Sequence, residues 1–214
     1  MNILVAYFSK TGNTEKLAVS IGDELIRRGH SVEYETIKPS VSYSWFREAA
    51  RDFPRYPFIA LSLLNTKYRE RYLRKYNQVE EDIQALKYPD ISAFDRICVG
   101  GPKWAQMSYP VARYLQIIRG IRGRKLGIFA TFGGPPLKVF EIELIYKPMT
   151  ILIERMGASV VARVAVSSAY HAAGIMPLFR FLSWLQFSKP IESFTLKSEY
   201  AHKGIMDFCD HIER

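Results

Sequence analysis

Strand-like and helix-like hydrophobic patterns follow one another along this chain. Apolar runs typical of buried strands cover residues 3–8, 94–102, 125–131 and 159–166, and residues 32–37 alternate in polarity as a further strand. Apolar residues recur at helical spacing in 15–28, 110–118 and 142–156, and a last helix pattern closes the chain at 207–212. Strands that alternate with helices predict an α/β fold with a doubly wound parallel sheet.

The first strand pattern leads directly into Ser9, Lys10, Thr11, Gly12, Asn13 and Thr14, and a helix pattern follows. The first turn of a helix has unpaired N–H groups and about half a positive charge, so it attracts anions. The hydroxyls and the amide of this loop add donors, and Gly12 lets the backbone approach a ligand. The loop therefore predicts a site for a phosphate monoester. The alternative is an ordinary helix start, with Thr11 or Asn13 as N-cap.

Two later strand patterns also end in loops that suit a ligand. The first of these loops contains Gly101, Pro102, Lys103 and Trp104, and the second contains Thr131, Phe132, Gly133 and Gly134. A large aromatic on a loop at a strand end favours stacking on a planar ligand, although Trp104 would also suit a core position. Tyr109 and Phe132 are the other stacking candidates. Pro110 is expected at the start of the next helix, where its missing N–H costs nothing.

Together these loops resemble those of the flavodoxin family. Residues 7–15 resemble its phosphate loop, T/S-x-T-G-x-T, residues 100–104 its G-x-P-x-W arrangement, and residues 132–135 its second flavin loop. The resemblance spans the chain except about 41–90 and 170–198. It implies FMN as cofactor, a five-stranded sheet of order 2-1-3-4-5, and the fourteen residues just named in the three loops as cofactor-binding residues. We expect one domain over 1–214, with insertions at those two places, the first mainly helical.

The charge of the chain departs from this family, whose simple electron shuttles are generally acidic. The formal net charge is +9, and residues 41–78 combine nine aromatic residues with eight bases and only three acids. A basic balance indicates acidic partners: an acidic ferredoxin, an anionic membrane surface or a phosphorylated nicotinamide. Nucleic acid is not expected, because no recognition motif accompanies the charge.

Two residues are candidates for tuning or catalysis. A cation about 8 Å from the flavin, at an effective dielectric near 20, would stabilise an added negative charge by roughly 2 kcal/mol, and Lys103 is the candidate. The alternative is that Lys103 points into solvent. His171, after the fifth strand pattern, is a weak candidate for a proton donor, against the plainer interpretation of a loop histidine.

The apolar run at 172–187 has Pro177 and Arg180 inside it and is too short for a membrane span. Three interpretations remain: an oligomer or core-packing element, a lid over the flavin, or an interfacial membrane helix. The two cysteines, Cys98 and Cys209, do not form a clustered thiol pattern, so no metal site is expected. Both are expected to be reduced, in a protein located in the cytoplasm. The N-terminus lacks the layout of a signal peptide.

These features predict an FMN-dependent oxidoreductase. Electrons would pass from a reduced nicotinamide or an iron–sulfur protein to a quinone-like or other acceptor, with a homo-oligomer and peripheral membrane contact as further expectations. The runner-up is a basic flavodoxin that only carries electrons between proteins, and a third alternative is a non-redox interaction protein. A nucleotide triphosphatase is disfavoured by the absence of G-x-x-x-x-G-K-[ST]. A phospho-receiver would need an acidic cluster at the strand ends.

Overall fold

The computed structural model describes residues 1–41, 82–104, 106–170 and 174–214, together with residues 61, 65, 67, 68, 70 and 71. Its centre is a five-stranded, all-parallel sheet of order β2-β1-β3-β4-β5, as the sequence predicts. The strands are β1 (Asn2–Tyr7), β2 (Ser31–Thr36), β3 (Arg96–Pro102), β4 (Lys125–Phe132) and β5 (Ser159–Ser167).

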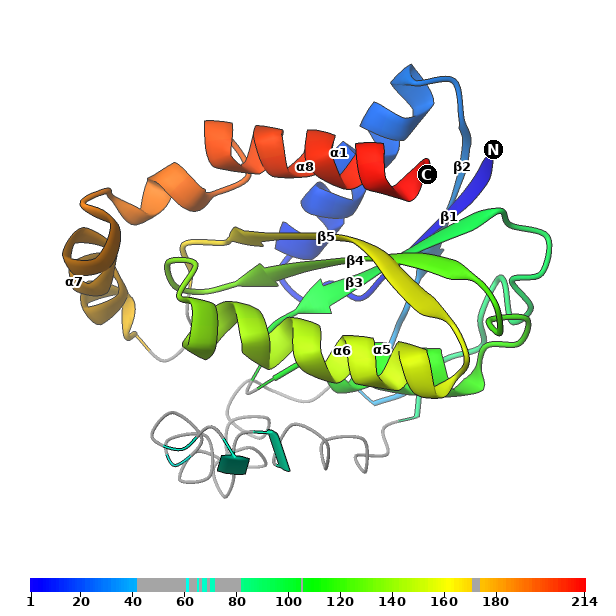
Figure 1. The fold of residues 1–214 in the computed structure, drawn as a ribbon, viewed down its shortest axis with the longest axis horizontal. Coiled ribbons are helices and arrows are strands. Elements are labelled where there is room, and N and C mark those ends of the chain that lie inside the picture. The colour runs from blue at the N-terminus through cyan, green and yellow to red at the C-terminus, as the bar shows by residue number, and fades with distance from the viewer. Residues whose placement is uncertain are drawn as a thin grey trace.

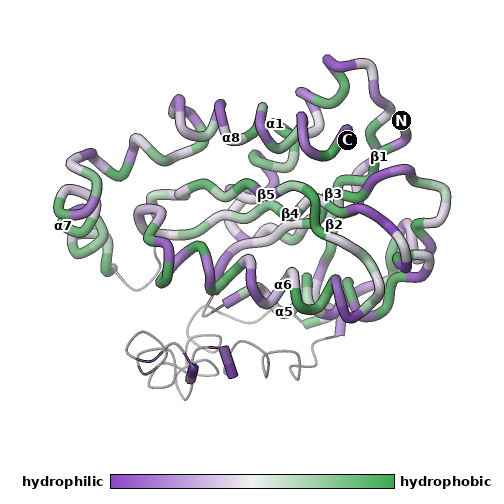
Figure 2. Tube along the Cα trace, viewed as in Figure 1, coloured by the Kyte–Doolittle hydropathy of each residue, from purple (hydrophilic) through white to green (hydrophobic). Residues whose placement is uncertain are grey.

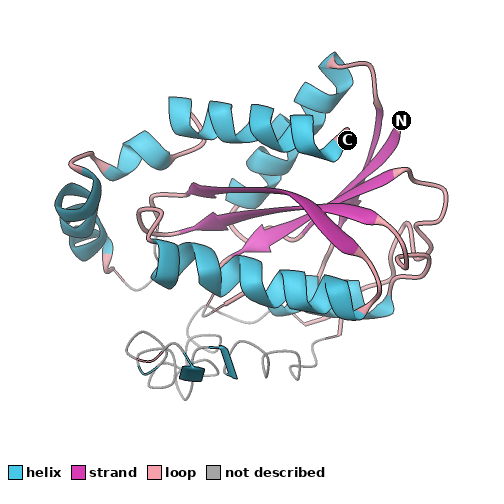
Figure 3. Ribbon diagram, in the orientation of Figure 1, coloured by secondary structure: helices cyan, strands magenta, loops and turns pink. Residues whose placement is uncertain are grey.

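Helices cover both faces of the sheet (Figures 1 and 3). One face carries α1 (Asn13–Arg27) and α8 (Glu199–Ile212), which contact each other, and the other carries α5 (Tyr109–Ile117) and α6 (Glu143–Arg155). A π-helical turn, η3 (Lys138–Ile142), leads into α6. The doubly wound α/β class is therefore confirmed.

Strand alternation divides the core into two clusters, one on each side of the sheet. Along β1, Leu4 and Ala6 pack with the α5 and α6 side, and Ile3 and Val5 pack with the α1 and α8 side. The green stretches along β1, β4 and β5 in Figure 2 follow from this burial, whereas the edge strand β2 is more polar. Cys98 of β3 and Cys209 of α8 are both buried in the second cluster as free thiols.

Local details differ from the sequence pattern at several places. Helix α1 begins at Asn13, and Gly12 is its N-cap in place of Thr11 or Asn13. Ile26, which shares the helical spacing of the buried residues of α1, is 51% exposed. Pro110 lies in the first turn of α5, as predicted. Most of the predicted insertion at 41–90 lies outside the described residues.

Two described parts of the predicted insertions can be placed. Residues 82–90 run beside β2, where the backbone N–H of Tyr88 donates to Glu35 Oε2 at 2.6 Å. The region after β5 contains α7 (Met176–Phe187) and a 3-10 turn, η4 (Ile191–Phe194). Helix α7 lies beyond the end of the sheet (Figure 1). Among the described helices, none has the length and apolar character to cross a membrane.

A charged cluster joins α1 to α8. The guanidinium of Arg28, which follows α1, contacts Glu24, Asp210 and Glu213 at 2.6, 2.6 and 3.0 Å. Hydrogen bonding from Arg27 lowers the pKa of Glu24 to about 2; burial opposes this shift, and Arg28 reinforces it. The two helices on this face are therefore linked by polar contacts as well as by their shared core.

Glu24→Gln should make the contribution of this cluster visible as a function of pH. Because the pKa of Glu24 falls from 4.5 to about 2 on folding, its stabilising effect is complete above pH 4.5 and disappears as the pH drops toward 2. We expect the variant to lose about 1 kcal/mol of unfolding free energy at pH 7 and clearly less at pH 3, measured by urea denaturation. An equal loss at both pH values would contradict the assignment.

Candidate functional site

The three predicted ligand loops meet at one edge of the sheet. The loops follow β1, β3 and β4, which are adjacent and parallel, so their carboxyl ends lie side by side (Figure 1). Tyr7 is in register with Gly100, and Pro102 with Thr131. β1 has β2 on one side and β3 on the other, so the strand order reverses at β1. Open α/β sheets bind ligands in the crevice at such a switch point.

The first loop presents a helix N-terminus without a side-chain cap. Gly12 adopts a left-handed conformation, with φ of 79°, and as the N-cap it has no side chain to accept a hydrogen bond from the first turn of α1. Asn13 Nδ2 donates to Thr11 Oγ1 at 3.1 Å, so the side chains of the loop bond to one another. The backbone N–H groups of this turn are thus available to an anion.

Thr14 ties the first loop to the third. Its hydroxyl and that of Thr131 are 2.7 Å apart, and both residues are buried. Thr14 is in the first turn of α1 and Thr131 is near the end of β4, so this single hydrogen bond bridges residues 117 positions apart. It holds two of the candidate binding loops in a fixed relation.

Trp104 is partly buried and packs among aromatic residues. Its ring makes edge contacts with Phe8 and Tyr109, with centroids 5.6 and 5.4 Å apart. The backbone N–H of Lys103 donates to the carbonyl of Thr131 at 2.7 Å, which continues the pairing of β3 with β4 into the second loop. Tyr109 and Phe132 are each 1% exposed, so in this structure neither offers a ring face to a ligand.

The side chain of Lys103 does not point into solvent, because its charge is paired inside the protein. It is only 11% exposed, and its Nζ lies 3.1 Å from Oε2 of Glu141, which is fully buried. Nζ also lies over the ring of Phe140, 4.9 Å from its centroid. Burial raises the pKa of the Glu141 carboxyl, and the Lys103 ammonium and the Gly134 backbone N–H oppose that rise. Sequence analysis missed Glu141.

Buried polar atoms without a hydrogen-bond partner among the described residues gather near these loops. They include Ser9 Oγ, Ser108 Oγ at the N-cap of α5, and the amide Nε2 and Oε1 of Gln106, a residue with no exposed surface. Such atoms are rare in folded proteins and cost about 1–3 kcal/mol each when left unpaired. The first two loops therefore contain polar groups that a ligand or water would satisfy. Gln106, next to the predicted loop, was also missed by the sequence analysis.

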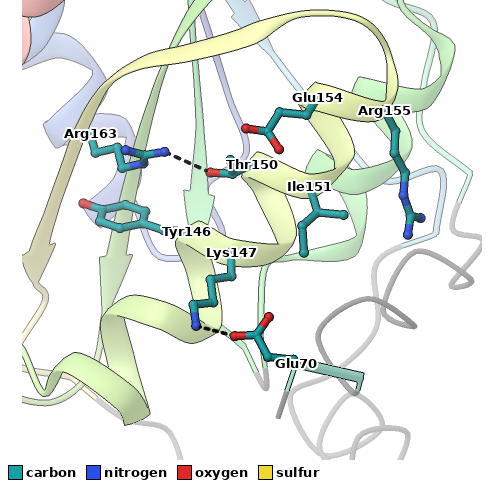
Figure 4. A pocket seen from close by; sticks show the side chains of 8 residues that line it. All are labelled: Glu70, Tyr146, Lys147, Thr150, Ile151, Glu154, Arg155 and Arg163. Atoms are coloured by element: carbon teal, nitrogen blue, oxygen red, sulfur yellow. Dashed lines mark hydrogen bonds and ion pairs between the residues drawn. The ribbon is translucent and has the colours of Figure 1, made fainter. Parts of the chain in front are cut away.

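Other candidate features lie elsewhere. His171 is outside the described residues, and among those that are described no cluster of His, Cys, Asp or Glu could hold a metal. An open pocket of about 640 Å³ runs along the outer side of α6 (Figure 4). Its wall includes the Lys147–Glu70 ion pair at 3.0 Å and Arg163, which donates to Thr150 at 3.4 Å. It does not include any of the three loops.

The fold is that of the flavodoxins. The structure is similar to a flavoprotein from Lactobacillus acidophilus NCFM in complex with FMN, with TM-score 0.51 and 17% identity over 77% of this chain and 92% of that chain. It is also similar to flavodoxin 2 from Bacillus cereus, with TM-score 0.53 and 14% identity over 100% of this chain and 98% of that one.

A short-chain flavodoxin associated with a bacterial microcompartment gives TM-score 0.53 and 11% identity, over 100% of this chain and 97% of that chain. No family model matches the sequence, and no curated protein does. At these identities the likeness concerns the fold, so the ligand has to be argued from the residues of this chain.

Thr131→Val tests the bond between the first and third loops without any ligand. The substitution preserves shape but leaves the buried Thr14 hydroxyl unpaired, and we expect a loss of about 1–2 kcal/mol in unfolding free energy by urea denaturation. Thr36→Val is the matched control, since Thr36 is exposed and its hydroxyl donates only a long 3.4 Å hydrogen bond to Tyr7, so this substitution should change less. Equal effects of the two substitutions would count against a structural role for the Thr14–Thr131 bond.

Proposed function

We propose that this chain binds FMN at the edge formed by the three loops. The observation that carries the proposal is the first loop, where an uncapped helix N-terminus lies beside Ser9, whose hydroxyl is buried without a partner among the described residues. A phosphate dianion suits this arrangement, because it accepts hydrogen bonds from backbone N–H groups and hydroxyls and favours the positive end of a helix. We assign the phosphate to residues 9–14.

The flavin ring is assigned to the second and third loops. Trp104 is the stacking candidate, and the backbone of residues 101–103 and 131–134 would meet the polar edge of the ring. Stacking on the flavin would use the face of the Trp104 ring, which packs against Phe8 and Tyr109 with interplanar angles of 88° and 76°. The likeness to an FMN-containing flavoprotein supports this assignment.

We further propose that the protein is an oxidoreductase that passes electrons from a reduced nicotinamide or an iron–sulfur protein to a quinone-like or other acceptor. Bound FMN supplies the redox chemistry, and the protein supplies binding, orientation and electrostatics. The second candidate function is that of a pure electron carrier, which the likeness to flavodoxins favours. The net charge of +9 suits acidic redox partners in either case.

Helix α7 is our proposed contact surface for a second subunit or a membrane surface. Its apolar side chains at Leu178, Phe181, Trp184 and Leu185 are 53–69% exposed, while Phe179 and Ser183 are its buried residues. An exposed apolar face of this kind marks an interaction site more often than a neutral surface. The single domain over 1–214 with two insertions remains part of this proposal.

Retention of FMN and its dependence on the phosphate test the binding site. The purified protein should keep the flavin absorption bands through gel filtration after incubation with FMN. Thr11→Ala combined with Thr14→Ala should weaken FMN binding by about 2–4 kcal/mol, because charge-assisted hydrogen bonds to the phosphate are lost. Binding of riboflavin, which has no phosphate, should change much less.

Ser20→Ala is the control for that variant, since Ser20 lies further along α1 and donates to the Lys16 carbonyl. Absence of retained flavin in the unchanged chain would overturn the proposed function. An equal loss for FMN and riboflavin would instead remove the phosphate from residues 9–14.

Turnover separates the two redox proposals. An oxidoreductase should consume NADH or NADPH in the presence of a soluble quinone, at a rate that falls when FMN is removed and returns when it is restored. A carrier should be inactive in this assay and should accept electrons only from an added acidic redox protein, with a rate that decreases as salt is raised.

A further inference from the structure

Glu141 lies where the second and third loops come together. Its carboxylate is 3.1 Å from Lys103 Nζ of the second loop and interacts with the Gly134 backbone N–H of the third. A Cβ placed on Gly134 would be 3.0 Å from Glu141 Oε1 and 3.0 Å from the ring of Phe179 in α7. The carboxyl group is thus enclosed by both loops and by α7, and Glu141 has no exposed surface.

Glu141, which has no exposed surface, can carry its negative charge only beside a cation. A buried carboxylate without a counter-charge is strongly destabilised and takes up a proton, while an ammonium beside it favours the charged form. With Nζ and Oε2 3.1 Å apart, the two groups form an ion pair. The net charge of this pair is zero.

The zero net charge of the pair affects the FMN proposed to bind here. The inference therefore rests on the proposed function. Lys103 is flanked by Pro102 and Trp104, and its backbone is bonded to Thr131, so the pair lies within the segment assigned to the flavin ring. An unpaired lysine there would stabilise the additional negative charge of reduced flavin, an attraction that acts over several ångströms in a region of low dielectric.

We propose that Glu141 is a positioning residue of the flavin site that joins the second and third loops and cancels the charge of Lys103. The bound flavin is then reduced in a locally neutral environment, although the protein carries a net charge of +9. The family resemblance of the sequence does not include this carboxylate, which follows the third loop inside η3.

Glu141→Gln tests the charge role directly. The carboxamide has nearly the same shape and keeps a polar oxygen beside Lys103 and Gly134, while the negative charge is removed. We expect the ratio of the dissociation constants of oxidised and reduced FMN to increase by about tenfold, because reduced FMN is then bound next to an uncompensated cation. For a two-electron couple this corresponds to about +30 mV in the midpoint potential.

Lys103→Met gives the opposite control. Without its cation, buried Glu141 takes up a proton, so the net charge of the site stays zero and the ratio should remain that of the unchanged chain. The double variant should also return to that ratio. A purely structural role would instead weaken both oxidation states of FMN equally in all three variants and leave every ratio unchanged.

Two further variants complete the experiment. Glu143→Gln removes a carboxylate two positions away that pairs with Lys147 at 3.2 Å on α6, and it should shift the ratio less than Glu141→Gln does. If Glu141→Gln does not fold, Glu141→Met removes the charge without burying an amide and should give the same increase.

The measurement is a redox titration of bound FMN against a reference dye, together with FMN affinity in each oxidation state. An increased ratio in Glu141→Gln that is absent in Lys103→Met is the expected result. An unchanged ratio in a Glu141 variant that binds FMN, or an equal increase in Lys103→Met, would overturn the role of Glu141. Failure of the unchanged chain to bind FMN would overturn the proposed function itself.

Discussion

The parallel pairing of β1 with both β2 and β3 is the constraint on which the candidate site depends. β1 is buried on both faces, and its register with β3 brings the residues after Tyr7 beside those after Gly100. The loop after β1 leads into α1 on one face of the sheet, and the loop after β3 leads into α5 on the other. The crevice between them is therefore a result of topology, and the loop residues determine what it binds.

Much of this arrangement could be predicted from the sequence, because strands buried on both faces are written as continuous apolar runs. The five strands, their order and the positions of the three loops follow from those runs and from the resemblance of the loops to a known family. The N-cap of α1 could not be predicted, because Gly12 takes this position through a left-handed backbone conformation. From the sequence, the neighbouring Thr11 and Asn13 are the better cap residues.

The electrostatics of the site could not be predicted from local sequence. Lys103 has no acidic neighbour nearby in the chain, and its counter-charge comes from η3, 38 positions later. Glu141 lies between Phe140 and Ile142, and a single carboxylate between apolar residues was the available signal of its burial. Ile26 and the outer face of α7 show the reverse failure, since apolar spacing alone does not say which side chains the fold covers.

The two free thiols can be used to measure how often α8 separates from the sheet. Cys98 and Cys209 face the same core from the sheet and from α8, and burial raises the pKa of both, that of Cys209 to about 12. Both side chains are fully buried, so an alkylating reagent cannot reach either sulfur while α8 stays on the sheet. The raised pKa values also keep both groups as thiols, and the thiolate is the reactive form. The rate of alkylation would therefore report how often this face separates, independently of any event in the loops at the other end of the strands.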